Sequence, residues 1–186
     1  MPSLTDNLSP ATCMPANNII LIGFMGSGKS SIGKQLATRL QYDYIDTDSL
    51  IVAKTGKSIA AIFETEGEAR FRELETEALK ELSTLSQKKF ILSTGGGIIL
   101  SEQNRMFLKS LGTVIWLNAS PDALFERARR QPYRPLLEVE YPRHTFDDLL
   151  AKRLPLYREA CDFEIDTTEL SYSKTVEELL KQLLKS

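Results

Sequence analysis

Residues 18–40 read NIILIGFMGSGKSSIGKQLATRL, and this stretch decides the fold of the chain. It opens with a short apolar, β-rich run at residues 19–22. The next segment is GFMGSGKS at residues 23–30, which fits the phosphate-loop spacing G-x-x-x-x-G-K-S/T. Apolar side chains then recur at helical spacing over residues 32–40. The stretch therefore predicts a strand, a glycine-rich turn and a helix, in the order that a phosphate-binding loop requires.

The residue types in this loop suit a polyphosphate. Many backbone N–H groups must reach the anion at once, and glycines leave that turn free of side chains. A helix that begins near Lys29 points unpaired N–H groups and the positive end of its dipole at the anion. The Lys29 ammonium can reach the β- and γ-phosphates, and Ser30 can offer its hydroxyl to Mg²⁺. The ATP-binding residues predicted here are Gly26, Ser27, Gly28, Lys29, Ser30 and Ser31.

The composition is that of one globular domain, because 42% of the 186 residues are hydrophobic. The 23 basic and 25 acidic residues leave a net charge of −2, which excludes a protein that binds nucleic acid or a membrane surface through bulk charge. No apolar run approaches the roughly 20 residues that span a bilayer. We therefore expect one folded domain over residues 18–186, with neither a nucleic acid nor a membrane as its partner.

The cysteines and the first residues point to an intracellular protein. Cys13 and Cys161 lie far apart, without the spacing of metal ligands, so reduced thiols are expected. Residues 1–17 lack the basic start and the apolar stretch of a secretory signal, and their prolines and scattered hydroxyl residues predict a flexible leader. A cytoplasmic location follows from both observations.

Two carboxylates end the next extended segment, YDYIDTD at residues 42–48. Ligands of an open parallel sheet sit beyond the carboxyl ends of its strands, so Asp46 and Asp48 should face the same crevice as the phosphate loop. Alternation along an extended chain would point both side chains the same way. We expect a metal-associated role for one and a base or hydroxyl-binding role for the other. The alternative is that they cap the helix expected from Ser49 onward.

A helical block follows over residues 49–87, with breaks predicted near Gly56 and Gly67. It is suited to forming a second wall of a cleft. Arg70 and Arg72 lie at the start of its longer helix, where a guanidinium could clamp a carboxylate with two hydrogen bonds. The alternative for either arginine is a surface charge that is solvated or paired.

Three consecutive glycines, Gly95, Gly96 and Gly97, come directly after the strand predicted at residues 89–94. Glycines at the end of a strand indicate that another group approaches the backbone closely. The turn falls at the carboxyl end of its strand, where ligands bind, which favours a functional role over a flexible turn without a ligand.

The basic run RARRQPYRPLL occupies residues 127–137. Residues 131–145 contain prolines and show no helical period, which is typical of a mobile lid over a nucleotide. Arg134 could then swing onto phosphates and Arg127 onto the base. The two arginines between them are interpreted as a solvated helix end.

Strand and helix alternate five times along the chain, which predicts an α/β fold with a five-stranded parallel sheet and helices on both faces. The predicted strands are residues 19–22, 42–48, 89–94, 113–117 and 161–166. A helix is expected over residues 146–157, with a kink at Pro155. Right-handed crossovers would bring all the functional loops to one edge of the sheet.

From about Ile19 to its end, the chain resembles the shikimate kinases. The phosphate loop alone is shared with other small-molecule kinases of the nucleoside-monophosphate-kinase group, so the resemblance depends on the whole series of motifs. In order, the motifs are GFMGSGKS at residues 23–30, DTD at 46–48, TGKSI at 55–59 with IF at 62–63, GE at 67–68 with FRELE at 71–75, GGG at 95–97, RPLL at 134–137 and RLPLY at 153–157.

The resemblance implies a P-loop kinase architecture, with a helical substrate-binding insert at about residues 49–80 and a lid at about residues 128–146. It implies that the shikimate-binding residues are Asp48, Arg72, Gly95, Gly96, Gly97 and Arg153. The arginines would take the carboxylate of shikimate, while Asp48 and a glycine N–H would hold its ring hydroxyls.

On the nucleotide side, the resemblance implies that Lys29 binds phosphate and that Ser30 and Asp46 hold Mg²⁺, Asp46 through a water molecule. It implies that Arg134 of the lid contacts ATP and that Arg127 stacks on adenine. The catalytic residues would be Lys29, Asp48 and Arg134. The family's adenine loop corresponds to the region after Asp166, where this chain departs from the usual pattern, so those contacts stay open.

The implied activity is transfer of the γ-phosphoryl group of ATP to the 3-hydroxyl of shikimate, giving shikimate 3-phosphate and ADP on the route to chorismate and the aromatic amino acids. A monomer is expected from the same resemblance. Two alternatives stay open: a kinase for another small hydroxy acid such as gluconate, and a nucleotide-binding regulator that has lost turnover.

Overall fold

The computed structural model describes residues 17–84, 89–130, 140 and 142–184 of the chain. The predicted leader therefore lies almost entirely outside the described residues, and so do Arg134 and the middle of the predicted lid. No helix within the described part of the chain combines the length and the apolar character needed to cross a membrane.

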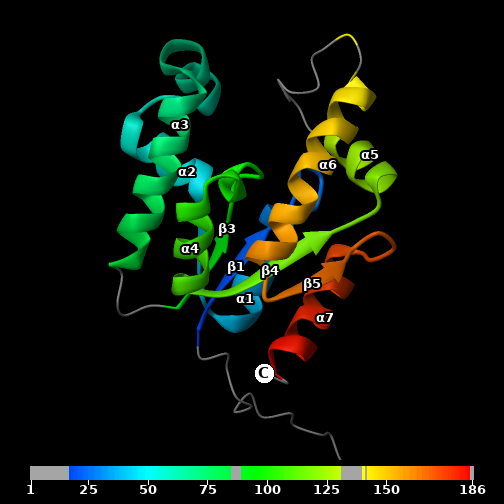
Figure 1. Ribbon diagram of the computed structural model, residues 1–186. Coiled ribbons are helices and arrows are strands. Elements are labelled where there is room, and N and C mark those ends of the chain that lie inside the picture. Colours follow the sequence, from blue (N-terminus) through cyan, green and yellow to red (C-terminus); the bar gives the residue numbers. More distant parts are fainter. Residues whose placement is uncertain (1–16, 85–88, 131–139, 141, 185–186) are drawn as a thin grey trace, which may run out of the picture.

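A twisted parallel sheet forms the centre of the molecule (Figure 1). Within the described residues it has five strands in the order β2-β3-β1-β4-β5, and every neighbouring pair is parallel. The strands are β1 (Asn18–Ile22), β2 (Asp43–Asp46), β3 (Phe90–Ser93), β4 (Gly112–Asn118) and β5 (Phe163–Asp166). The predicted sheet is confirmed. The phosphate loop, residues 23–30, leaves the central strand β1 at the carboxyl edge.

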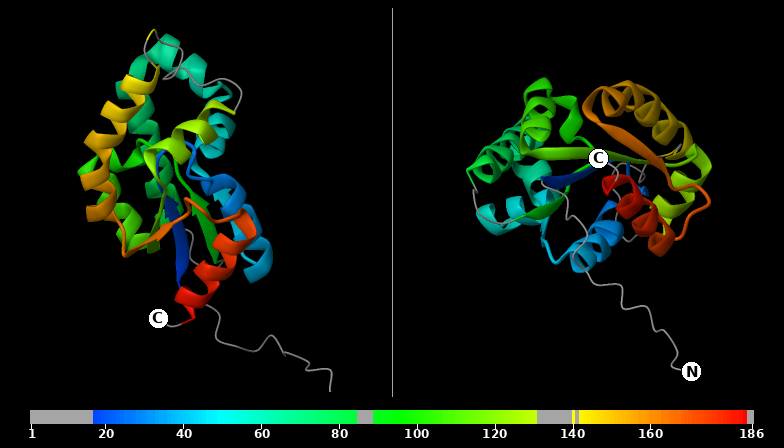
Figure 2. Two further views of the ribbon diagram at one scale, coloured as in Figure 1. Left: turned by 90° about the vertical axis from the view of Figure 1, so that its right-hand side faces the viewer. Right: turned by 90° about the horizontal axis from the view of Figure 1, so that it is seen from below.

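Helices cover both faces of this sheet, as predicted (Figure 2). They are α1 (Lys29–Leu40), α2 (Thr47–Thr55), α3 (Ile59–Ser83), α4 (Glu102–Leu111), α5 (Pro121–Arg129), α6 (Pro142–Ala160) and α7 (Tyr172–Leu183), with a short 3₁₀ helix η1 (Ile98–Leu100). Ile20 and Ile22 of β1 pack with side chains of α3, α4 and α6. Ile19 and Leu21 pack with α1 and α7 on the opposite face. Because both faces are buried, the strand is a continuous apolar run instead of an alternating one.

The helical block between β2 and β3 is divided where the glycines predicted it. Gly56 ends α2 in the left-handed conformation, with a φ of 69°. Gly67 interrupts α3 with a φ of 84° and a ψ of 171°. The second part of α3 buries Phe71, Leu74 and further apolar side chains, so its inner face is fixed against the rest of the molecule.

Helix α6 differs from the prediction, because it begins at Pro142 and runs to Ala160. The expected bounds of 146–157 were too short at both ends, and Pro155 lies inside a continuous helix. A proline in a helix interior costs about 3 kcal/mol. Arg153 and Tyr157, on either side of it, are buried and hydrogen-bond to the carbonyl oxygen of Gly96. These tertiary contacts favour the helix across the proline. Together with α5, α6 also makes the two ends of the predicted lid helical.

Candidate active site

The phosphate loop joins β1 to α1 through glycines in conformations that other residues rarely adopt. Gly26 has a φ of 82°, and a Cβ atom at this position would collide with the carbonyl oxygen of Leu124 in α5. Gly28 has a φ of 87° and precedes α1, whose first N–H groups donate no hydrogen bond to a side chain at the cap position. These N–H groups and the dipole of α1 form a site for an anion.

The Lys29 side chain folds back over this loop. Its ammonium donates hydrogen bonds to the carbonyl oxygens of Gly23 at 2.8 Å and Phe24 at 3.0 Å. It also donates to the hydroxyl of Ser27 at 3.3 Å. The positive charge is therefore held inside the loop, where it can exchange carbonyl oxygens for phosphate oxygens.

Asp46 is the last residue of β2, and its two carboxylate oxygens face different partners. Oδ1 accepts hydrogen bonds from the backbone N–H groups of Asp48 at 3.1 Å and Ser49 at 3.2 Å, so it caps α2. Oδ2 accepts from the hydroxyls of Ser30 at 3.4 Å and Tyr44 at 3.2 Å. Capping and a role beside the phosphate loop thus coexist in one side chain. A carboxylate and a hydroxyl are oxygen ligands of the kind that Mg²⁺ takes together with water and substrate phosphates.

Asp48 lies in the first turn of α2 and not in an extended segment. The alternation argument was therefore wrong for this pair, because the chain turns helical at Thr47 as soon as Asp46 caps it. The Asp48 carboxylate still lies close to the glycine turn, since a Cβ atom on Gly95 would come within 3.0 Å of its Oδ1. The N–H of Gly95 donates to the Thr47 hydroxyl at 2.9 Å, which fixes the turn beside α2.

The glycine turn, residues 95–97, is approached closely by two more helices, as the three glycines predicted. The carbonyl oxygen of Gly96 accepts hydrogen bonds from Tyr157 at 2.6 Å and from Arg153 at 3.4 Å, both on α6. A Cβ atom on Gly97 would collide with Nη1 of Arg72 on α3 and would lie 2.7 Å from its Nη2. A side chain at residue 97 would displace this guanidinium.

Arg72 and Arg153 place two guanidinium groups at one end of the site. Arg72 pairs with Glu75 at 2.8 Å and with the more exposed Glu68 at 2.7 Å. Arg153 is only 8% exposed and lies over the ring of Phe24, 5.4 Å from its centroid. Two partly buried cations in one place require anions, and a substrate carboxylate would supply one.

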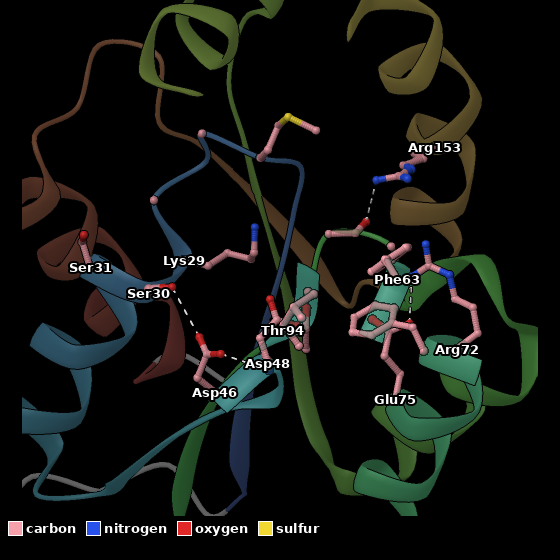
Figure 3. Close-up of a pocket in the computed structure, with 18 residues that line it drawn as sticks. Lys29, Ser30, Ser31, Asp46, Asp48, Phe63, Arg72, Glu75, Thr94 and Arg153 are labelled. Atoms are coloured by element: carbon pink, nitrogen blue, oxygen red, sulfur yellow. Dashed lines mark hydrogen bonds and ion pairs between the residues drawn. The ribbon is translucent and has the colours of Figure 1, made fainter. Parts of the chain in front are cut away.

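The charged groups of the phosphate loop, of α2, α3 and α6 and the glycine turn meet at one pocket of about 270 Å³ (Figure 3). Lys29, Ser30 and Asp46 lie on one side of it, Arg72, Glu75 and Arg153 on the other, and Asp48 between them. The pocket thus has a phosphate-binding flank and an anion-binding flank, with a carboxylate at their junction.

The sequence and fold match known proteins over most of their length. Residues 25–184 match the family model described as shikimate kinase. The curated shikimate kinase of Neisseria gonorrhoeae is 45% identical over 165 residues, which is 89% of this chain and 95% of that protein. That of Thermodesulfovibrio yellowstonii is 43% identical over 165 residues, 89% of this chain and 94% of that protein. The chain belongs to the shikimate kinase family.

Solved structures agree with this membership. Shikimate kinase from Acinetobacter baumannii, in complex with shikimate, superposes with a TM-score of 0.85 at 41% identity, covering 91% of this chain and 93% of that one. A gluconokinase from Sinorhizobium meliloti has a TM-score of 0.60 at 20% identity over 92% of this chain and 93% of that one, which shows the shared fold alone. The P-loop kinase architecture is confirmed, and the chain is an ATP-dependent phosphotransferase.

Most residues predicted for a shikimate kinase site meet in the pocket. Those that line it are Gly26, Gly28, Lys29, Ser30, Ser31, Asp46, Asp48, Arg72, Gly95, Gly96, Gly97 and Arg153. Ser27 is buried behind the loop and contributes its hydroxyl to Lys29. Arg134 lies outside the described residues. Arg70 points elsewhere and pairs with Glu73 and Glu77, as its surface alternative proposed. The individual roles stay predictions.

Arg127 lies apart from the pocket, on α5. Its guanidinium donates to the hydroxyl of Thr167 at 3.0 Å and to the carbonyl oxygens of Thr167 at 2.7 Å and Thr168 at 2.9 Å. These bonds hold the segment after β5, where the adenine loop of a shikimate kinase was expected. Stacking of Arg127 on adenine stays a prediction. The bonds to Thr167 and Thr168 already fix the orientation of its guanidinium.

Several residues of the pocket were given no role by the sequence. Phe63 and Phe71 pack with ring centroids 4.7 Å apart and form an apolar wall with Ile59. Glu75 is fully buried beside Arg72. Its position three residues after Arg72 on a helix was the available signal, since such residues share a helix face.

The environment of Glu75 changes its acidity. Burial raises the pKa of the Glu75 carboxyl from 4.5 to about 7, although the hydrogen bond and the charge of Arg72 oppose this. The Asp48 carboxylate raises the pKa further, and the Arg153 charge lowers it. Glu75 therefore titrates near neutral pH in the folded protein.

We expect the free energy of unfolding to fall as pH rises from about 4.5 to about 7, because the folded state holds the Glu75 proton that the unfolded state releases. Once Glu75 is deprotonated in both states, its burial has lowered the free energy of unfolding by about 3 kcal/mol. A Glu75→Gln variant lacks this effect. Denaturant unfolding of both proteins between these pH values measures the effect: the stability of the variant relative to the wild type should increase with pH. A constant difference would contradict the buried, titrating carboxyl.

Proposed function

We propose that this kinase transfers the γ-phosphoryl group of ATP to the 3-hydroxyl of shikimate, giving shikimate 3-phosphate and ADP in the biosynthesis of chorismate and the aromatic amino acids. The observation that carries the proposal is the pocket that joins the phosphate loop to the paired guanidinium groups of Arg72 and Arg153. A relative of 41% identity has been solved with shikimate bound, which supports the same acceptor here.

On the phosphate-binding flank, the N–H groups of the phosphate loop and the Lys29 ammonium bind the β- and γ-phosphates. Ser30 and Asp46 would hold Mg²⁺, Asp46 through a water molecule. When bound there, the ion would supply positive charge that stabilises the charge developing on the phosphate oxygens. Arg134 brings a further positive charge from the lid, and Arg127 stacks on the adenine ring.

On the opposite flank, Arg72 and Arg153 bind the shikimate carboxylate. Asp48 and the N–H groups of the glycine turn hold the ring hydroxyls, so that one hydroxyl lies in line with the γ-phosphorus. The transition state of phosphoryl transfer is loose and spreads charge over oxygens, so alignment and neutralisation supply most of the rate enhancement. Asp48 accepts the proton of the attacking hydroxyl late in the reaction.

Release of ADP, measured in a coupled assay with shikimate, with gluconate and without an acceptor, tests this function. We expect kcat/KM for shikimate to exceed that for gluconate by at least about a hundredfold, because two guanidinium groups and a rigid pocket suit a cyclic carboxylate. Equal or greater turnover with gluconate would favour the other kinase. Turnover that does not depend on any acceptor, or no turnover, would favour a nucleotide-binding regulator.

The proposal extends to the state and place of the enzyme. We infer a monomer from the resemblance to the shikimate kinases, and a cytoplasmic location, where ATP is available. Light scattering of the purified chain during gel filtration tests the first, and fractionation of the source cells tests the second.

A further inference from the structure

Helix α4 lies between the two helices that carry the guanidinium groups, with α3 on one side and α6 on the other (Figure 1). It follows the glycine turn after only the short η1 helix. Its first turn contacts both neighbours through adjacent residues, Asn104 toward α3 and Arg105 toward α6. Neither side chain lines the pocket.

Asn104 is fully buried and joins α4 to α3 through one side chain. Its Oδ1 lies 2.7 Å from the hydroxyl of Thr76, which also lies 3.1 Å from the carbonyl oxygen of Arg72. Thr76 has one hydroxyl proton for these two acceptors. The Asn104 Nδ2, which carries two protons, is buried without a hydrogen-bond partner among the described residues.

Rotation of the Asn104 amide by half a turn resolves this conflict, because the oxygen and nitrogen of an amide are assigned from their hydrogen bonds. Nδ2 then donates to the Thr76 hydroxyl, and that hydroxyl donates its own proton to the carbonyl oxygen of Arg72. The amide oxygen and one proton of Nδ2 are then without a partner among the described residues, in place of both protons of Nδ2. A directed chain of hydrogen bonds thus runs from α4 to the backbone of Arg72.

The other side of α4 is fixed as well. Arg105 donates to the carbonyl oxygen of Ile99 in η1 at 2.8 Å and pairs with Glu159 of α6 at 3.0 Å. The first turn of α4 is therefore held to the end of the glycine turn and to α6. The hydrogen bond between Asn104 and Thr76 therefore connects α3 to a helix turn that is itself bonded to η1 and α6.

We propose that Asn104 and Thr76 are positioning residues that hold Arg72 against the glycine turn at the spacing required by the substrate carboxylate. The inference deepens the proposed function and rests on it. The guanidinium of Arg72 lies so close to Gly97 that a Cβ atom on this residue would collide with it. A shift of α3 away from α4 opens this contact and separates Arg72 from Arg153, which weakens two-point binding of the carboxylate.

A Thr76→Val variant tests the proposal, because valine keeps the shape of threonine and loses the hydroxyl. We expect KM for shikimate, and its Kd measured by calorimetry without nucleotide, to rise on the order of tenfold. The values of kcat and KM for ATP should stay within about twofold of the wild type, since the phosphate loop is untouched. Thr76→Ser should restore wild-type binding.

Thr65→Val is a matched control, since Thr65 lies on the same helix and its hydroxyl donates to the carbonyl oxygen of Ala61, four residues earlier. It should leave KM for shikimate unchanged. The double variant, Thr76→Val with Asn104→Leu, should bind shikimate as tightly as whichever of the two single variants binds it more weakly. Either single change already breaks the hydrogen bonds between Asn104, Thr76 and the backbone of Arg72.

Three outcomes would overturn the proposal while the wild type phosphorylates shikimate: a lower melting temperature of Thr76→Val with unchanged shikimate binding, an equal rise in KM for both substrates, or multiplicative losses in the double variant. If Thr76→Val or the double variant does not fold, Thr76→Ser is compared with Asn104→Ser instead. Loss of shikimate binding is then expected in Asn104→Ser only. A wild type without shikimate turnover would instead refute the proposed function itself.

Discussion

A Lys29→Met variant should lose about a thousandfold in kcat, while its fold stays intact. Methionine has nearly the length of lysine but carries no charge. The ammonium now bonds to the carbonyl oxygens of Gly23 and Phe24 within the phosphate loop, at 2.8 and 3.0 Å. In the transition state it would neutralise charge that spreads over the oxygens of the transferring group, an interaction stronger there than in the ground state. Single-turnover kinetics with saturating ATP and shikimate measure the loss.

Lys34→Met is the matched control for this variant. Lys34 lies on the same helix, exposed, with its ammonium 5.6 Å from the centroid of the Tyr44 ring. Its removal should change kcat by less than about twofold. Thermal unfolding of both variants shows whether the fold survives. A Lys29→Met enzyme that keeps a tenth or more of the wild-type kcat would remove Lys29 from its assigned role.

An Asp48→Asn variant should lose roughly 10²- to 10⁴-fold in kcat, the usual contribution of a positioned base. Asparagine keeps the size of the side chain and can still hydrogen-bond to a ring hydroxyl, but it does not take up the proton. The KM for shikimate should therefore change much less than kcat. Measurement of kcat and of KM for both proteins separates the two effects.

Asp122→Asn serves as the control for Asp48→Asn. Asp122 also lies in the first turn of a helix, α5, but its side chain is 83% exposed and outside the pocket. The same change of charge near a helix dipole should leave kcat within about twofold. Near-native turnover by Asp48→Asn would show that another group accepts the proton or that no base is needed.

The sequence predicted the architecture because the three inner strands, β1, β3 and β4, contain uninterrupted apolar runs that are followed by glycine or polar residues. Such runs occur where both faces of a sheet are buried, and the carboxyl edge then collects the loops. The phosphate loop, Asp46 and Asp48 and the glycine turn could be placed together on this ground alone.

Other parts of the site depend on packing that no local pattern contains. Pro155 predicted a kink, but buried neighbours on α6 hold the helix across it. Asp48 was placed on an extended segment, because the helix expected from Ser49 onward begins two residues earlier, at Thr47. Glu75 looks like any charged residue of an amphipathic helix until burial beside Arg72 raises its pKa. Arg127 was assigned to the base, and its bonds to Thr167 and Thr168 could not be foreseen.

The crowding around the glycine turn limits how the acceptor range of this enzyme can be redesigned. Directed evolution that randomises residues 95–97 samples side chains for which the neighbouring groups leave no room, beside Asp48 at Gly95 and beside Arg72 at Gly97. Libraries at Phe63 have more freedom, since this side chain lines the pocket and is 39% exposed. New acceptors for this enzyme are therefore to be selected by changing pocket residues of α3 such as Phe63, while residues 95–97 stay glycine.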